Sequence, residues 1–357
     1  MKILLIAPRP NIQGPLPKHT PVLINSLVSN GSDVTFMGWG CHSNNENIFQ
    51  KTIGRVIDAF SIKLNIKKKS FNILVLKTGH NFPTLLRDIL LLSLVHNCAK
   101  KISIQFHGSQ SSKLVSSGSI LFKWLSRWLI SFADSIIVLS NEEKDQWQRF
   151  SPKTPCFTTA NPFNPPSVCL NVANRSDSKI LFVGRLIEEK GILDLIDAFN
   201  FLLPEFDCTL TIAGEGRLKE HIEEIILKRG LTDRIKMVGY VKDDELFQLY
   251  ESSTVLVLPT YFYEGFPTVI TEAMFMCLPI VTTSTRGARD YLREGENALF
   301  VPPKDSRFLA NSISQLLKNK LLREQMGKNN KELVKEFIPE KIGNDYFNIL
   351  QETISQN

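Results

Sequence analysis

The sequence predicts an α/β protein made of two doubly wound, Rossmann-like domains. Its 357 residues suffice for about two domains, each with its own core, because a domain typically holds about 100–200 residues. Short β-rich runs alternate with amphipathic or polar stretches, and this alternation starts at Ile3 and again at Ile180. Such repetition is typical of parallel sheets covered by helices. Segment 161–166 lies between the two series, and its three prolines disfavour both helix and central strand.

Each strand is expected where apolar residues run together, as in parallel strands buried on both faces. The first series places strands at 3–7, 34–37, 73–76, 102–106 and 136–139. The second places them at 180–184, 210–213, 235–238, 255–258, 280–283 and 299–301. The predicted domains are therefore 1–165 and 166–339, followed by a helix over 340–357. The carboxyl ends of both sets of strands are expected to face a common cleft, where ligands of such folds bind.

One predicted helix of the first half has a marked apolar stripe. Its apolar residues at helical spacing are Leu121, Trp124, Leu125, Trp128, Leu129 and Phe132. We favour a helix packed on its sheet, because it directly precedes the strand at 136–139. The alternative is a helix that lies on a membrane surface.

Composition excludes several classes of protein. Hydrophobic residues make up 43% and charged residues 22%, which is ordinary for a globular chain and unlike a disordered one. No run of about 18–20 uncharged apolar residues predicts a membrane span, and the first apolar run stops at Pro8, as a strand would and a signal peptide would not. The six cysteines include no C-x-x-C pair, so free thiols in the cytoplasm are expected.

Charge is divided unevenly along the chain. Residues 1–165 carry 19 basic and 8 acidic side chains, a net charge of +11, whereas 166–357 carry 23 and 28, a net charge of −5. A basic half suits an anionic membrane surface, a phosphorylated substrate or nucleic acid, and 67–69 is its densest run of lysines. The alternative is a solvated surface. Because the chain contains no nucleic-acid recognition motif, we expect no nucleic-acid partner.

Two cations follow the first strand of the second half. Arg185 and Lys190 are five residues apart, after a glycine that ends the buried strand and before a helix. Arginine offers a planar fork and lysine a mobile point charge, so the pair suits the two phosphates of a nucleotide diphosphate. The alternative is that both are solvated beside Glu188 and Glu189.

Two carboxylates follow the strand at 255–258. Glu264 is expected in a loop and Glu272 in the first turns of a helix opened by Pro267. Both carboxylates can then enter one cleft while the amides at the helix N-terminus point at a phosphate.

These motifs, in this order, resemble a retaining glycosyltransferase of family 4 with the GT-B fold. The matching segments are 182–185 with 190–191, 212–216, and 264–267 with 272–274, and the likeness extends to 133–140, 161–162 and 295–303. In such enzymes the matching arginine and lysine, here Arg185 and Lys190, hold the donor diphosphate and stabilise the charge of the leaving group. The resemblance also implies that the C-terminal helix crosses back to the first domain.

The resemblance implies roles for further residues. Glu264 matches the glutamate that contacts the transferred sugar, and Glu272 matches the one that binds the ribose hydroxyls. His107 closes a strand in the first half, where the family often keeps a histidine near the sugar hydroxymethyl group. Donor contacts through backbone groups are implied for Gly184, Gly214, Gly265, Phe266, Pro267 and Thr268. Gly14 would approach the diphosphate and acceptor, although the family usually has paired glycines there.

Two other segments are not expected to bind a ligand. Asp290 stands where the family commonly has a glutamate, and we expect the neighbouring Arg286 and Arg289 to lie at the surface rather than on the acceptor. The cluster 243–245 is read as the first turn of a helix that ends near Tyr250, because no Asp-x-Asp occurs in the chain. No metal and no other cofactor is therefore expected.

The sequence thus predicts transfer of a sugar from a nucleotide-diphosphate sugar to a saccharide or lipid-linked saccharide, with retained configuration. Bacterial surface polysaccharide synthesis is the expected context, in the cytoplasm or at the inner membrane face, where the basic half would contact an anionic surface. Two alternatives stay open. One is a nucleotide-sugar epimerase on the same scaffold, and the other is a catalytically silent sugar-nucleotide binding protein.

Overall fold

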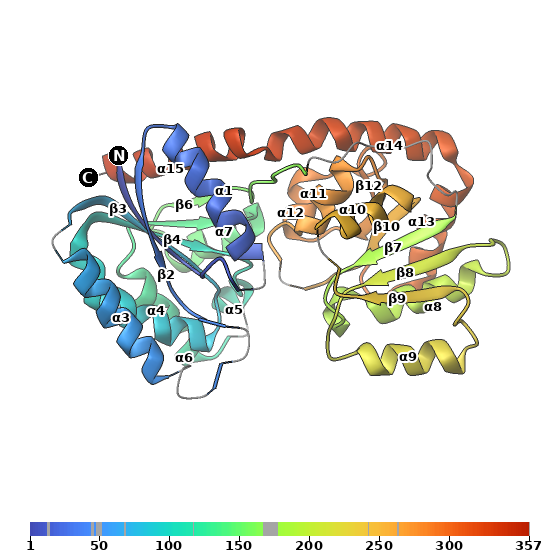
Figure 1. The fold of residues 1–357 in the computed structure, drawn as a ribbon, viewed down its shortest axis with the longest axis horizontal. Helices are drawn as coiled ribbons and strands as arrows, with labels where there is room; N and C mark the ends of the chain where they lie inside the picture. Colours follow the sequence, from blue (N-terminus) through green and yellow to red (C-terminus); the bar gives the residue numbers. More distant parts are fainter. Residues whose placement is uncertain are drawn as a thin grey trace. The chain divides into compact units, whose positions relative to one another are not determined.

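The computed structural model contains two parallel six-stranded sheets, each with its own helices (Figure 1). It describes residues 1–12, 15–43, 46–47, 52–67, 69–116, 118–166, 178–241, 243–262 and 264–356, with the backbone alone at Pro15 and Asp243. Contacts divide the chain into a first unit, Met1–Asn164 with Tyr263–Phe266 and Phe337–Asn357, and a second unit, Pro165–Phe262 with Pro267–Glu336.

The sheet of the first unit has the order β2-β1-β3-β4-β5-β6. Its strands are β1 (Lys2–Ala7), β2 (Asp33–Gly38), β3 (Phe71–Thr78), β4 (Ala99–Phe106), β5 (Ser135–Val138) and β6 (Cys156–Thr158). All neighbouring strands pair in parallel, with Ile3 opposite Val34 on one side and Ile73 on the other. The five strands expected here are confirmed, and the short edge strand β6 was missed.

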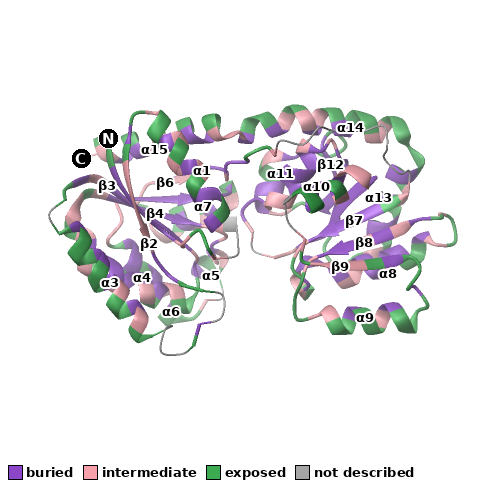
Figure 2. Cartoon of the chain, viewed as in Figure 1, coloured by how far each residue is buried: buried purple, intermediate pink, exposed green. Residues whose placement is uncertain are grey.

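The sheet of the second unit has the order β12-β11-β10-β7-β8-β9. Its strands are β7 (Lys179–Val183), β8 (Thr209–Ala213), β9 (Ile235–Gly239), β10 (Val255–Leu258), β11 (Ile280–Thr283) and β12 (Ala298–Val301). All six strands expected here are confirmed. Figure 2 shows that the strands of both sheets are largely buried, as the continuous apolar runs predict.

Helices connect the strands in both units. The first unit contains α1 (Pro15–Ser29), α3 (Ile53–Ile66), α4 (Phe82–Val95), η1 (His96–Cys98), α5 (Ser112–Val115), α6 (Ile120–Ile130), α7 (Asn141–Phe150) and α15 (Pro339–Ser355). The second contains η3 (Glu188–Lys190), α8 (Ile192–Leu202), α9 (Lys219–Lys228), α10 (Asp243–Ser252), α11 (Thr268–Phe275), α12 (Arg286–Tyr291), α13 (Ser306–Lys318) and α14 (Lys320–Leu333). The 3-10 turn η4 (Val334–Phe337) precedes α15. The helix at 243–245 continues two residues past Tyr250.

The two faces of the first sheet have separate cores. Because side chains alternate along a strand, Leu4 and Ile6 of β1 pack with α3, α4, α6 and α7, whereas Ile3 and Leu5 pack with α1 and α15. Helix α15 is held by hydrogen bonds from the Tyr346 hydroxyl to Gln105 Oε1 (2.9 Å) and from the Thr353 hydroxyl to Ser135 Oγ (2.9 Å). The C-terminal helix is therefore part of the first unit.

The apolar stripe of α6 is divided between core and solvent. Leu125 and Leu129 are buried, as a helix packed on its sheet requires, but Leu121, Trp124 and Trp128 are 57%, 56% and 42% exposed. The packed interpretation is therefore wrong for these three residues. Phe122, Ser126 and Ile130 of α6 are buried as well. The apolar stripe predicted from the sequence therefore lies only partly in the core.

Candidate functional site

The second sheet reverses its strand progression at β7. From β7 the chain adds β8 and β9 on one side and then β10, β11 and β12 on the other, so β7 and β10 are neighbours at the switch point. In open α/β sheets, ligands bind beyond the carboxyl ends of the strands at such a point. Gly184 directly follows β7, and Pro259 directly follows β10. The loops that begin at these two residues are therefore the first candidates for a ligand site.

Glycines let the backbones of these loops approach one another closely. Gly214 has a φ of +147°, and a Cβ there would lie 1.8 Å from the carbonyl oxygen of Gly184. Gly191 has a φ of +70°, and its Cβ would lie 2.3 Å from the carbonyl oxygen of Pro259. Only glycine fits both positions, since any side chain would collide with backbone. The loops after β7, β8 and β10 are thus joined backbone to backbone at the candidate site.

The two predicted cations meet at one aromatic ring. The guanidinium carbon of Arg185 lies 4.6 Å from the ring centroid of Phe262, and Nζ of Lys190 lies 5.8 Å from it. Arg185 is exposed and Lys190 is 5% exposed. The turn that carries Lys190 is fixed because the Glu189 carbonyl accepts hydrogen bonds from Tyr261 N (2.9 Å) and the Thr260 hydroxyl (3.2 Å). The structure therefore brings Arg185 and Lys190 together, as a diphosphate site would need.

Sequence reasoning missed Phe262. The signal was available, because the run 261–263 places three aromatic residues directly after the predicted strand at 255–258. An aromatic ring between two cations holds them in place by cation–π attraction without neutralising their charge.

Glu272 is buried and hydrogen-bonded within the second unit. It lies in α11, five positions into the helix, and its Oε2 accepts a hydrogen bond of 2.9 Å from the Tyr250 hydroxyl. Burial raises the pKa of Tyr250 well above its usual value, and the charge of Glu272 raises it further, so the hydroxyl stays protonated and keeps donating. Pro267 is the N-cap, so the free amides of α11 begin at Thr268, as expected of a phosphate-facing helix end.

The segment before α11 packs within the first unit. A Cβ on Gly265 would lie 2.1 Å from Leu139 Cβ, and the Phe266 ring stacks on that of Phe337 at 5.2 Å between centroids. Glu264, the predicted sugar contact, is half-buried beside this close approach. A side chain at position 265 has no room, so the position of Glu264 is fixed by its neighbour.

The first unit holds a second group of predicted and unpredicted residues. His107 follows β4, and its amide donates to the Thr78 carbonyl at 3.0 Å. Lys77, in β3, is 1% exposed and is paired in register with Gln105 of β4. His19 of α1 is buried and hydrogen-bonds the backbone of Pro162. The three side chains influence one another electrostatically, so they form one polar cluster at the carboxyl ends of β3 and β4.

Burial shifts the pKa values of this polar cluster toward the uncharged forms. Burial lowers the pKa of Lys77 to about 7. Burial also lowers the pKa of His19, and the nearby charges of Lys77 and Lys18 lower it further, to about 3. Burial, Lys77 and His19 also place the pKa of His107 well below its usual value. Within the described part of the chain, His107 Nε2 and Asn161 Oδ1 are buried atoms with no hydrogen-bond partner. A ligand is one explanation for such unsatisfied atoms.

The two arginines beside Asp290 differ in exposure. Arg286 is 3% exposed, so the expectation that it lies at the surface is wrong, whereas Arg289 is exposed as expected. Arg286 begins α12 with a φ of +36°, a left-handed conformation that is uncommon for a residue other than glycine. Gly14 lies outside the described residues.

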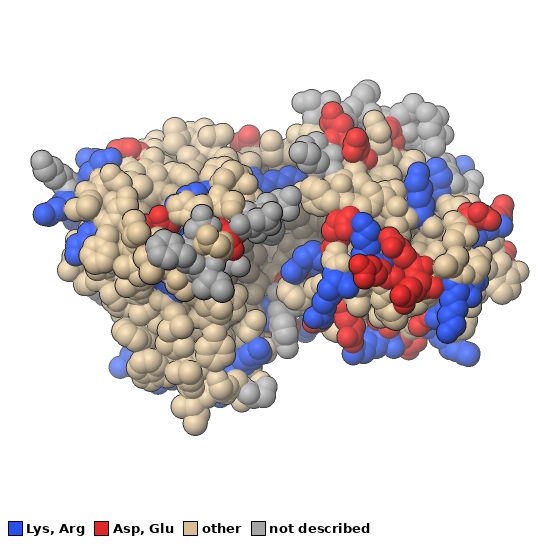
Figure 3. All heavy atoms as spheres, turned by 60° about the horizontal axis from the view of Figure 1, so that its bottom comes forward, with Lys and Arg blue, Asp and Glu red and all other residues tan. Residues whose placement is uncertain are grey.

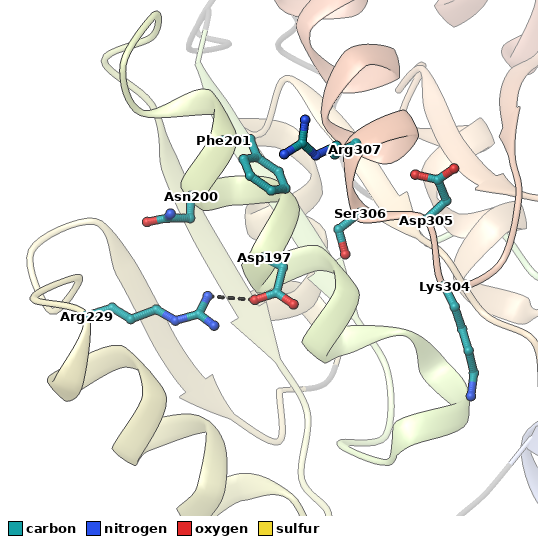
Figure 4. Close-up of a pocket in the computed structure, with 8 residues that line it drawn as sticks. All are labelled: Asp197, Asn200, Phe201, Arg229, Lys304, Asp305, Ser306 and Arg307. Atoms are coloured by element: carbon teal, nitrogen blue, oxygen red, sulfur yellow. Dashed lines mark ion pairs between the residues drawn. The ribbon is translucent and has the colours of Figure 1, made fainter.

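The residues that line the hollow shown in Figure 4 include none of the predicted site residues. The hollow measures about 460 Å³ and lies between α8 and the start of α13. Two of its cations are paired with carboxylates, Arg229 with Asp197 at 2.7 Å and Lys304 with Glu188 at 3.6 Å, and Arg307 lies over the Phe201 ring at 5.3 Å. Among the described residues, no group of three or more His, Cys, Asp or Glu side chains is arranged to hold a metal ion.

Residues 171–333 match the family described as Glycosyl transferases group 1. This chain is similar to that family over the matched segment, which is a little less than half of its length. It is 27% identical to an uncharacterized glycosyltransferase of Methanocaldococcus jannaschii over 96% of this chain and 95% of that protein. A second uncharacterized glycosyltransferase of the same organism is 33% identical, but that match covers 52% of this chain and only 46% of the relative.

A third relative has a more specific name. It is the Campylobacter jejuni enzyme named GalNAc-alpha-(1->4)-GalNAc-alpha-(1->3)-diNAcBac-PP-undecaprenol alpha-1,4-N-acetyl-D-galactosaminyltransferase. It is 25% identical over 65% of this chain and 64% of its own length.

Solved structures show the same fold over the whole chain. Sucrose-phosphate synthase from Thermosynechococcus elongatus has a TM-score of 0.80 and 20% identity, with 98% of each chain covered. Anabaena HepE, in complex with UDP and glucose, has a TM-score of 0.71 and 18% identity, covering 98% of this chain and 99% of that one. The fold is therefore GT-B, as the resemblance implied. In the described residues, no helix is both long and apolar enough to span a membrane.

Proposed function

We propose that this protein transfers a sugar from a nucleotide-diphosphate sugar to a saccharide or lipid-linked saccharide and retains the anomeric configuration. The observation that carries the proposal is the convergence of Arg185 and Lys190 on Phe262 at the switch point of the second sheet. A diphosphate is the donor group that suits a planar fork beside a point charge. The UDP bound by Anabaena HepE, which shares this fold, supports a nucleotide donor.

In this proposal the second unit holds the donor. Arg185 and Lys190 clamp the diphosphate, with backbone contacts from Gly184, Gly214 and Thr268. The amides at the start of α11 face a phosphate. Glu272 accepts hydrogen bonds from the ribose hydroxyls, and the hydrogen bond from Tyr250 fixes its carboxylate for that purpose. The nucleotide is thereby oriented before the reaction begins.

In the first unit, Glu264 and His107 are the proposed contacts to the sugar. Glu264 binds the transferred sugar, with Gly265, Phe266 and Pro267 presenting backbone beside it. His107 binds the sugar through Nε2, the buried atom for which the described residues provide no partner. Its lowered pKa supports a neutral imidazole at physiological pH.

Retention follows if the acceptor attacks the face from which the nucleotide leaves. The bond between the anomeric carbon and the diphosphate oxygen breaks, a bond to the acceptor oxygen forms on the same side, and the acceptor proton passes to the departing phosphate. Arg185 and Lys190 stabilise the negative charge that develops on that phosphate. Because two side-chain cations supply this charge, we propose that the reaction needs no metal, and transfer is expected to persist in excess EDTA.

The acceptor is proposed to be part of a bacterial surface polysaccharide made at the inner face of the cytoplasmic membrane. Two observations support this context. The name of the Campylobacter jejuni relative contains a PP-undecaprenol-linked saccharide, and the first 165 residues carry a net charge of +11.

Proton NMR of the reaction tests the proposal. The protein is incubated with UDP-, GDP- and ADP-sugars, with and without saccharide acceptors. We expect release of one nucleoside diphosphate and a product with the anomeric configuration of the donor. An inverted product would contradict retention. An epimerised nucleotide sugar without released diphosphate would identify an epimerase, and binding without any turnover would identify a binding protein.

A further inference from the structure

Exposed apolar side chains are concentrated on four helices of the first unit. Among the described residues, 18 large hydrophobic side chains are exposed, and 12 of them lie on α3, α4, α5 and α6, which together hold only 43 residues. We call these 12 the apolar face: Ile53, Val56, Ile57, Phe60, Leu64, Phe82, Leu86, Val115, Ile120, Leu121, Trp124 and Trp128. Patches of this kind mark interaction sites, because an isolated soluble surface rarely tolerates them.

These helices lie side by side on one face of the first sheet. Helix α3 packs against α4, α4 against α6, and α5 against α6 (Figure 1). All four contribute to the core that includes Leu4 and Ile6 of β1, the short α5 through Leu114. The helices that carry the apolar face therefore cover one face of the sheet, and α1 and α15 lie on the other.

Two of the helices are apolar on both sides. In α3, Arg55, Ala59, Ile62 and Ile66 are buried, while Ile53, Ile57, Phe60 and Leu64 recur at helical spacing on the exposed side. In α6, Ile120, Trp124 and Trp128 recur every four residues on the exposed side, with the two indole centroids 5.2 Å apart. A helix whose second side is also apolar is typical of burial against a further apolar phase.

The exposed charges on the four helices of the apolar face are of one sign, although α7, which packs against α5, also carries the exposed Asp145. Every exposed charged side chain described on the four helices is basic, namely Lys63, Lys113 and Arg127. The acidic residues there are occupied: Asp58 is paired with Arg9 and His42, and Asp88 accepts hydrogen bonds from Trp39, Thr78 and Arg87. In Figure 3 the forward side of the first unit is drawn mostly without charged groups. An apolar centre with a basic border is complementary to a bilayer that has anionic headgroups.

We infer that the apolar face docks on an anionic lipid bilayer, with Trp124 and Trp128 inserted at the headgroup level. Indoles favour this depth because their rings are apolar and their N–H groups can still reach water. The exposed lysines can extend their apolar stems along the surface and keep their charge among the headgroups. This inference deepens the proposed function. It rests on that function in one respect only, namely that the acceptor is linked to a lipid.

Intrinsic tryptophan fluorescence offers a direct readout. The chain has four tryptophans, and Trp39 and Trp147 are each 1% exposed, so a change of emission on adding vesicles reports on Trp124 and Trp128. With vesicles of phosphatidylglycerol and phosphatidylcholine in equal amounts, we expect a blue shift and co-sedimentation at low salt. With phosphatidylcholine alone or at high salt, both signals should weaken, because the basic border then adds nothing.

A matched pair of variants makes the test specific. The double variant Trp124→Ser/Trp128→Ser should lose co-sedimentation by about tenfold or more, since two inserted indoles contribute most of the apolar contact. The control Phe308→Ser/Leu321→Ser removes exposed apolar side chains from the second unit and should bind vesicles as the wild type does. Circular dichroism of both variants should match the wild type, because the substituted residues lie at the surface.

Three results would overturn the inference. These are absence of wild-type binding to the anionic vesicles, unchanged binding of the tryptophan double variant, and a lipid-free dimer that this double variant dissociates. The last result would identify a second copy of the chain as the occupant. Binding of a nucleoside diphosphate is measured on the same samples, and we expect both variants to keep it. Failure of the proposed function would appear as absence of nucleoside-diphosphate binding. Failure of this inference would appear as absence of vesicle binding, so the two are distinguishable.

Discussion

The side chain of Phe262 joins the two residues that carry the proposed chemistry. Its ring centroid lies 4.6 Å from the guanidinium carbon of Arg185 and 5.8 Å from Nζ of Lys190. Phe262→Ala keeps both charges and removes their shared support. We expect it to weaken nucleoside-diphosphate binding by about two- to thirtyfold, because a cation–π contact contributes roughly 0.5–2 kcal/mol. Phe201→Ala removes the corresponding ring from Arg307 and serves as the control. Equal affinities for the two variants in a calorimetric titration would show that Phe262 does not organise the site.

Lys77 gives the stability of the protein a specific pH dependence. Burial lowers the pKa of Lys77 from the usual 10.5 to about 7. Between these values the unfolded chain holds a proton that the folded chain has released, so the free energy of unfolding rises with pH, by at most about 1.4 kcal/mol per unit. Lys77→Met removes this dependence. The variant should be more stable than wild type at pH 7, by about 1 kcal/mol or more, and its advantage should shrink toward pH 10.

Urea denaturation of both proteins at pH 7, 8, 9 and 10 measures this difference. Parallel stability curves across the series would mean that Lys77 keeps its ordinary pKa in the folded state. If the variant is less stable than wild type at pH 7, the folded protein stabilises the charged ammonium of Lys77. That result would contradict the lowered pKa that burial predicts.

The residues of the candidate site differ in how far the sequence predicts them. Arg185, Lys190 and Glu272 follow predicted strands or open a predicted helix, so their proximity to the switch point follows from the order of elements. Lys77 and His19 did not stand out, because a lysine within an apolar strand and a lone histidine on a helix carry no chemical pattern until folding brings them together. Arg286 is buried where the backbone is left-handed, a conformation that its residue type does not signal.

At the scale of elements, apolar runs predicted every strand of both sheets except β6. That strand has only three residues, Cys156–Thr158, at a sheet edge, where little apolar surface is required. The stripe of α6 shows the opposite limit. Helical periodicity identifies an apolar side but does not say whether core or solvent receives it, and here the core takes Leu125 while the surface takes Trp124.

The packing of α15 on α1 gives a prediction at the same scale. Gly343 is the point of closest approach, since a Cβ there would lie 2.3 Å from Ser26 Cβ. Gly343→Leu should separate the two helices and lower the free energy of unfolding by about 1–3 kcal/mol, as overpacking does. Asn348→Leu, at an exposed position of the same helix, should change it by less than about 0.5 kcal/mol. Thermal unfolding of both variants checks the assignment, and equal stabilities would place the tight contact elsewhere.

The whole molecule assigns different chemistry to its two units. The second unit presents a cation pair at a switch point, together with a buried carboxylate on α11. The first unit presents a polar cluster at the ends of β3 and β4, an excess of basic residues and the apolar face. This division predicts that the second unit determines nucleotide affinity and that the first determines what receives the sugar and where the protein acts.

Calorimetric titration of UDP, GDP and ADP tests the central claim most directly, with wild type, Arg185→Ala, Lys190→Met and the control Arg229→Ala. Arg229 is an arginine of the same unit whose charge is paired with Asp197. We expect one nucleotide series to bind the wild type and the control alike, and each of the other two variants to lose about ten- to hundredfold in affinity, as loss of a charge-assisted hydrogen bond requires. If Arg185→Ala and Lys190→Met bind as tightly as Arg229→Ala, the diphosphate is not held at this switch point.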